Sequence, residues 1–209
     1  PVTTFTTRDE IARMRLWGIA SYGGENNVGT IFSYSIDDNS FVKHYDQPVY
    51  WDDYYNEERL YSPLIPGPDG VFYGHREENY GTGMFEMDSQ GNVKWWGDIS
   101  YFEKSQLLLA SNSHIYSTTN DNWVPGIIDE YDIENQTLIL GSRMEFFTHL
   151  SNPSTPLIEP GDGYLYGARG SGGVNGGGFI YKFRLDGSDY GIFHYFGNLS
   201  SRMKPHSGV

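Results

Sequence analysis

The sequence predicts an all-β protein made of repeated antiparallel sheets, and three observations lead to this fold class. A phrase of an apolar, an aromatic and a small residue occurs four times, beginning at Leu16, Phe72, Ile115 and Leu165. These starts lie 56, 43 and 50 residues apart. Asp-Gly pairs, which favour the positive φ angles of tight hairpin turns, accompany several copies. The composition, with 26 Gly, 17 Tyr and 12 Phe in 209 residues, is typical of short strands joined by turns.

Each copy of the phrase is expected to be the second strand of a four-stranded unit. An apolar first strand runs into a turn before it, as at Asp69-Gly70 and Asp162-Gly163. A polar, Gly-rich loop follows the phrase. Third strands with alternating inward and outward residues are expected at residues 31–36, 84–87 and 179–183. Fourth strands are expected at residues 41–45 and 191–196.

Four antiparallel strands repeated at this spacing describe the blades of a β-propeller with little helix. We expect one propeller domain over residues 1–209, or a portion of a larger propeller. The expected blades cover residues 1–50, 60–103, 104–150 and 153–200. Residues 204–209 match the start of a further blade. Either the chain is the N-terminal part of a larger propeller, or this last strand closes the ring by completing the first blade. We favour the former and expect the four blades to pack with further blades from another segment or another chain.

The charge of the chain excludes some classes of partner. The formal net charge is −13, and no basic stripe interrupts the acidic composition. Such a surface repels nucleic acid and anionic membranes, so neither is expected as a partner. No apolar run approaches the roughly 20 residues that cross a bilayer. The chain has no cysteine, which leaves secretion open because large β folds can be stable through core burial alone.

The repeats resemble the GloVer-type tandem repeat of bacterial secreted proteins. The resemblance covers most of residues 16–209 and is carried by Gly23-Gly24, Gly29-Thr30-Ile31-Phe32 and Leu165-Tyr166-Gly167. The third blade departs most, because Ser117 replaces the glycine of the phrase. The resemblance implies a β-propeller at the cell surface or outside the cell. It also implies one activity, since propellers of similar repeats include lyases of ulvan, a sulfated polysaccharide that contains uronic acids.

Positions where one copy breaks the shared pattern are candidates for chemistry. Two small residues typically follow the phrase in this family, but here His75 and Arg76 follow it in the second blade and Arg169 in the fourth. These positions are expected to come after the second strand and to meet on one rim. The alternative is that His75 and Arg76 are merely solvated loop residues. Small neighbours of Arg169, including Gly170, would allow a ligand to approach closely.

Other candidates are aromatic residues of the same loops and one histidine. Tyr22, Tyr80 and Trp123 lie in the polar loops that follow the phrase and could stack against a sugar ring. His206 stands where other first strands have leucine, which suits either a structural residue or a ligand contact. The acidic residues show no metal-ligand spacing, and no phosphate loop or nucleophile triad is recognisable. No metal and no cofactor is therefore expected.

Two hypotheses of different class remain open from the sequence. The first is a polysaccharide lyase that cleaves a uronic-acid polymer such as ulvan by β-elimination. An Arg clamp on the carboxylate and a His or Tyr base are required, and His75, Tyr80 and Arg169 would be catalytic, with Arg76, Tyr22, Trp123 and His206 binding substrate. The second is a propeller that binds glycan or protein without catalysis. The charged departures favour the enzyme, whereas the net charge favours the binding module because a polyanion would be repelled.

Overall fold

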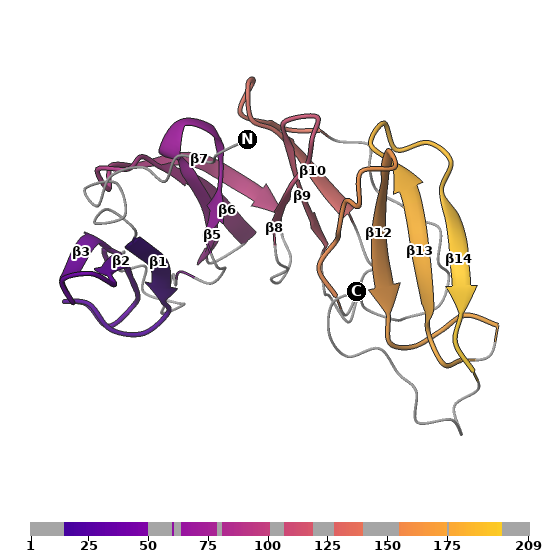
Figure 1. The fold of residues 1–209 in the computed structure, drawn as a ribbon, viewed down its shortest axis with the longest axis horizontal. Coiled ribbons are helices and arrows are strands. Elements are labelled where there is room, and N and C mark those ends of the chain that lie inside the picture. Colours follow the sequence, from indigo (N-terminus) through magenta and orange to yellow (C-terminus); the bar gives the residue numbers. More distant parts are fainter. Residues whose placement is uncertain are drawn as a thin grey trace, which may run out of the picture. The chain divides into compact units, whose positions relative to one another are not determined.

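A computed structural model describes residues 15–49, 60, 64–78, 81–100, 107–118, 128–139, 155–174 and 176–197. Within these ranges the chain forms four antiparallel sheets of three or four strands, which confirms the predicted all-β class (Figure 1). The helical content of the described ranges is a single 3₁₀ turn, η1 (Pro68–Gly70). None of the helical structure described is long and apolar enough to cross a membrane.

The strands of each sheet follow one another in chain order, as predicted for a repeated four-strand unit. The first sheet contains β1 (Arg15–Ala20), β2 (Thr30–Ser35) and β3 (Phe41–Asp46). The second contains β4 (Ile65–Pro66), β5 (Phe72–Glu78), β6 (Gly81–Met87) and β7 (Val93–Ser100). The third contains β8 (Leu107–Leu109), β9 (His114–Thr118), β10 (Ile128–Asp132) and β11 (Thr137–Leu138). The fourth contains β12 (Tyr164–Arg169), β13 (Phe179–Arg184) and β14 (Gly191–Tyr195).

The Asp-Gly pairs form the tight turns that the sequence predicts. Asp69 and Gly70 have φ angles of 54° and 76°, and the amide of Val71 donates to the carbonyl oxygen of Pro68 over 3.0 Å. Two consecutive positive φ angles closed by this hydrogen bond match the twist of a hairpin between β4 and β5. The first strand of the fourth sheet is shorter than predicted, since it is reduced to one bridge between Ile158 and Tyr166.

The small residue of the repeated phrase makes room for an aromatic ring of the third strand. A Cβ atom at Gly18 would lie 2.9 Å from Cζ of Phe32, and one at Gly74 or Gly167 would overlap the ring of Phe85 or Tyr181. The third sheet differs because its small residue, Ser117, pairs with Asp129 rather than with an aromatic residue. No ring has to be accommodated there, and serine replaces glycine at no steric cost.

The chain divides into two compact units, each with its own core. Unit 1 comprises Pro1–Asn79 and Met84–Trp95, and unit 2 comprises Tyr80–Gly83 and Trp96–Val209. The core of unit 1 joins the first and second sheets through buried Ile31, Leu60, Phe85 and Met87. The core of unit 2 joins the third and fourth sheets through buried Ala110, Tyr116, Ile128, Leu157, Leu165, Phe179, Tyr181 and Phe183.

Candidate functional site

The charged residues that break the repeat lie within strands, not in the loops after them. His75 and Arg76 belong to β5, and Arg169 is the last residue of β12. The prediction that they follow the second strand was wrong, because strand pairing extends further than the pattern indicated: Arg169 still pairs with Phe179. Three other predicted site residues, Tyr80, Trp123 and His206, lie outside the described residues.

Burial separates the described candidates into two groups. His75 and Arg169 are each only 3% exposed, whereas Tyr22 is 62% exposed in the loop between β1 and β2. His75 lies in unit 1 and Arg169 in unit 2, so each is considered with its own neighbours. A substrate can reach Tyr22 directly, but it can reach the side chains of His75 and Arg169 only if their surroundings move.

Arg76 packs on an aromatic ring of its own unit. Its guanidinium carbon lies 3.9 Å from the centre of the Trp95 ring, and its backbone forms a bridge with Leu60. A cation this close to an indole face is stabilised by the ring quadrupole. Within unit 1, Arg76 of β5 therefore packs on Trp95 of β7, across the intervening strand β6 of the same sheet.

Arg169 lies among aromatic side chains of the fourth sheet. Its guanidinium carbon is 5.9 Å from the centre of the Phe179 ring, and it interacts electrostatically with Tyr181 and Tyr190. Burial lowers the pKa of the Arg169 side chain, and the two neighbouring tyrosines act in the opposite direction. Burial also raises the pKa of Tyr181, so this phenol stays protonated at neutral pH. Tyr181 is thus neutral and a weaker acid than an exposed tyrosine.

The Gly-rich segment after β12 folds back over the end of that strand. Gly178 has a φ angle of 94°, and a Cβ atom there would overlap the carbonyl oxygen of Arg169. A side chain at Gly177 would overlap the carbonyl of Gly197, and one at Gly173 would lie 2.9 Å from the Tyr195 ring. Gly178 therefore allows close backbone packing at Arg169, and Gly173 and Gly177 allow it at the end of β14. A run of glycines is typical both of close backbone packing and of an open binding loop. The sequence analysis considered only the binding loop.

The loop that carries Tyr22 is fixed by amide side chains. Asn27, with a φ angle of 58°, accepts a hydrogen bond from the amide of Gly23 over 3.1 Å. Asn26 donates to the carbonyl oxygen of Gln47 over 3.0 Å. Lys43 forms ion pairs with Asp46 and with Glu25, the second over 3.3 Å. Tyr22 is thus exposed on a loop whose conformation is fixed by hydrogen bonds of Asn26 and Asn27 and by the ion pair of Glu25.

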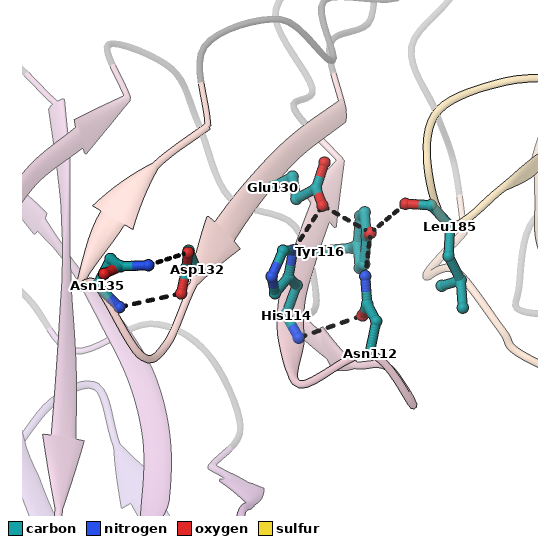
Figure 2. A network of polar contacts seen from close by, with 7 residues as sticks. All are labelled: Asn112, His114, Tyr116, Glu130, Asp132, Asn135 and Leu185. Carbon is teal, nitrogen blue, oxygen red and sulfur yellow. Dashed lines mark hydrogen bonds and ion pairs between the residues drawn. The ribbon is translucent and has the colours of Figure 1, made fainter.

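A polar network centred on Tyr116 joins the two sheets of unit 2 (Figure 2). The Tyr116 hydroxyl lies 2.9 Å from Oε1 of Glu130 and 2.8 Å from the carbonyl oxygen of Leu185, and it accepts a hydrogen bond from Asn112. Nδ1 of His114 is 2.6 Å from the same Glu130 oxygen. Burial is the main cause that raises the pKa of Tyr116 well above its usual value. The network was missed from the sequence, because Tyr116 belongs to the repeated phrase and showed no departure from it.

Within the ranges that the structure describes, no group of three His, Asp or Glu side chains is placed to hold a metal ion. The polar clusters described above combine one or two carboxylates with amides, a hydroxyl, and either the His114 imidazole or the Lys43 ammonium. The chemistry they can support is hydrogen bonding, stacking and charge neutralisation.

Comparison with known proteins supports the fold and leaves the family undefined. No family model and no curated protein sequence matches the chain. Among solved structures, TolB from Acinetobacter baumannii is similar at a TM-score of 0.55 and 11% identity, over 86% of this chain and 41% of TolB. A candidate 6-phosphogluconolactonase from Bacteroides fragilis has a TM-score of 0.53 and 15% identity, over 98% of this chain and 53% of that protein. A similar protein from Bacteroides uniformis has a TM-score of 0.53 and 10% identity, over 91% and 57%.

Proposed function

From its fold, four antiparallel sheets that match known β-propellers, we propose that this chain is a propeller module that binds a glycan without catalysis. The observation that carries the proposal is the contrast in exposure between the predicted residues. His75 and Arg169, two of the three predicted catalytic residues, are 3% exposed, whereas the predicted stacking residue Tyr22 is 62% exposed. Of the two functions that the sequence left open, binding is thus the better supported.

The Tyr22 loop has the features of a sugar platform. An exposed aromatic ring on a loop held by Asn26 and Asn27 can stack on a pyranose ring with little loss of conformational entropy. Glu25 and Asp46 lie at the same loop and pair with Lys43. Their carboxylates and the net charge of −13 favour a neutral glycan over a polyanion. An extracellular glycan agrees with the resemblance to secreted bacterial repeat proteins.

Titration calorimetry on neutral and uronate polysaccharides tests this proposal. Wild-type protein should bind a neutral glycan, and Tyr22→Ala should weaken binding about fivefold, because stacking of this kind contributes on the order of 1 kcal/mol. Val174→Ala is a matched control in another loop, at a side chain that is 81% exposed, and should leave affinity unchanged. Equal affinity of Tyr22→Ala and wild type would contradict the proposal.

Lyase activity is a second candidate, favoured by the position of Arg169 beside Tyr181 and Tyr190. An arginine that neutralises a carboxylate is one of the groups that β-elimination needs, and the two tyrosines place phenol hydroxyls near it. Incubation with ulvan, followed by ultraviolet absorbance of unsaturated chain ends, separates the two functions. If unsaturated product forms and Arg169→Ala reduces the rate of its formation about 100-fold, the lyase hypothesis is correct and the hypothesis of non-catalytic binding is wrong.

A further inference from the structure

The fourth sheet carries a buried hydroxyl group at a position where two other sheets have a phenylalanine. In the first and second sheets the ring that packs on the glycine of the repeated phrase belongs to Phe32 or Phe85. In the fourth sheet it belongs to Tyr181, whose hydroxyl lies against Gly167. Tyr181 is only 2% exposed. A phenylalanine would fill the same space, so packing alone does not require the hydroxyl.

The Tyr181 hydroxyl has no hydrogen-bond partner among the residues that the structure describes. A buried hydroxyl that makes no hydrogen bond lowers the stability of the folded state. Nearly all such groups in folded proteins have a partner, which is another protein group, a water molecule or a bound ligand. The hydroxyl therefore indicates an acceptor other than the described part of the chain.

A cation lies beside this hydroxyl. Arg169 pairs with Phe179 on β12 and β13, two positions from the pair of Gly167 and Tyr181 (Figure 1). Residues two apart on a strand share one face of the sheet, so Arg169 and Tyr181 project to the same side. The guanidinium interacts electrostatically with the phenols of Tyr181 and Tyr190, whose rings lie 6.1 Å apart. One positive charge and two phenol hydroxyls are thus brought together in unit 2.

The surroundings of these three groups favour a small anion as the acceptor. A buried guanidinium attracts an anion more strongly than a neutral molecule, because the low dielectric of the interior screens charge poorly. Hydrogen bonds to an ionised acceptor are also stronger than those to a neutral one. The packing limits the size of the ion, since a Cβ atom at Gly167 would overlap the Tyr181 hydroxyl and one at Gly178 would overlap the Arg169 carbonyl.

We propose that the side chains of Arg169, Tyr181 and Tyr190 bind a small monovalent anion of the size of chloride. Tyr181 donates its hydroxyl proton to the ion, Arg169 supplies the positive charge and Tyr190 supplies a second hydroxyl. Tyr181 belongs to the core that joins the third and fourth sheets, so the bound ion stabilises the folded state of unit 2. The inference does not depend on glycan binding, which is proposed at Tyr22 in unit 1.

Urea denaturation with chloride in place of gluconate, at constant ionic strength, tests the proposal. The wild-type ratio of folded to unfolded chain should rise about tenfold when the chloride concentration is ten times its Kd. Tyr181→Phe should be at least as stable as the wild type in gluconate, because it removes the buried hydroxyl, and it should not respond to chloride. Tyr164→Phe is the matched control, since the Tyr164 hydroxyl donates to Asp189, and it should respond as the wild type does.

NMR of the chloride nucleus gives a direct readout and supplies the Kd. The wild type should broaden the chloride line, and excess bromide should reverse the broadening by competition. Arg169→Gln, a second variant, should weaken chloride binding at least about tenfold, because it removes the charge that holds the ion.

Three results would overturn the proposal. The first is a wild type whose stability is the same in chloride and gluconate. The second is a Tyr181→Phe chain that responds to chloride as the wild type does. The third is a Tyr181→Phe chain that is clearly less stable than the wild type in gluconate, which would mean that the hydroxyl already has a neutral partner such as a water molecule.

Discussion

In each unit an aromatic residue of the repeated phrase packs against the next sheet, but the chemical groups around that residue differ between the units. In unit 1 the residue is Trp17, which stacks on His44 at 4.3 Å and tilts against Phe72. In unit 2 the residue is Tyr116, whose hydroxyl lies within hydrogen-bonding distance of Glu130, Asn112 and the Leu185 carbonyl. The comparison shows that the repeat specifies an aromatic ring between sheets, and that each contact adds its own polar groups around it.

Replacement of Tyr116 or Trp17 by alanine should give the largest loss of stability and should show which of the two sheet contacts is stronger. Tyr116 is 1% exposed, so Tyr116→Ala should lower the free energy of unfolding by about 3–5 kcal/mol through lost burial and a cavity. Trp17 is only partly buried, and Trp17→Ala should cost less, about 2 kcal/mol. Urea denaturation followed by circular dichroism measures both. An equal or larger loss for Trp17→Ala would show that the aromatic stack is the stronger contact.

A methyl group at the phrase glycine of the fourth sheet should give the next largest effect. A Cβ atom at Gly167 would overlap the Tyr181 hydroxyl and approach Leu157, both buried in the core. Gly167→Ala should therefore destabilise unit 2 by about 1–3 kcal/mol. Gly191→Ala in β14 is the control, because no atom lies within 4 Å of the added methyl group. A neutral Gly167→Ala would mean that Tyr181 can move without cost.

The sequence predicted the repeat but not what the repeat buries. The Asp69-Gly70 turn and the third strands depend on local residue preferences, and the structure confirms them. The Arg169 side chain is buried among aromatic residues that lie 10 or more positions further along the chain, which no local pattern encodes. A charged residue that departs from a repeat was therefore read as solvent-facing, although it packs against Phe179 and near Tyr181.

Ser117, which replaces the phrase glycine in the third sheet, is a second feature that the sequence alone did not explain. Ser117 looked like a loss of the family pattern, but the register places Asp129 opposite it where other sheets have a ring. The two departures compensate each other. Only the pairing of the strands reveals that Ser117 and Asp129 belong together, since residues 118–128 separate them in the sequence.

Removal of the Tyr116 hydroxyl alone should isolate the polar part of the unit 2 contact. Tyr116→Phe keeps the ring against Phe183 but leaves Glu130 and the Leu185 carbonyl without this donor. A loss of about 1–2 kcal/mol in unfolding free energy is expected from urea denaturation. If Tyr116→Phe is as stable as the wild type, the hydroxyl network adds nothing to the free energy of unfolding. The sheet contact of unit 2 then depends on aromatic packing, as that of unit 1 does.

Acidification should affect unit 1 through His44 and gives the smallest expected effect. Burial, followed by the charge of Arg15, lowers the pKa of His44, while a backbone hydrogen bond at Gln90 opposes the shift. Nε2 of His44 lies 2.7 Å from Oγ of Ser33, which also accepts from Arg15 over 2.9 Å, so the neutral ring fits best. The unfolded chain, with a histidine pKa of about 6.5, binds a proton more readily than the folded chain does.

The contribution of neutral His44 to stability is therefore fully present above the unfolded pKa and is lost as the pH falls from there through the lower folded pKa. Urea denaturation at a series of pH values from neutral to mildly acidic should show the wild type losing stability relative to His44→Gln, which cannot titrate in this range. Above the unfolded pKa the difference between the two should be constant. If the difference does not change across this series, the ring is not held neutral in the folded chain, and the stack on Trp17 is insensitive to its charge.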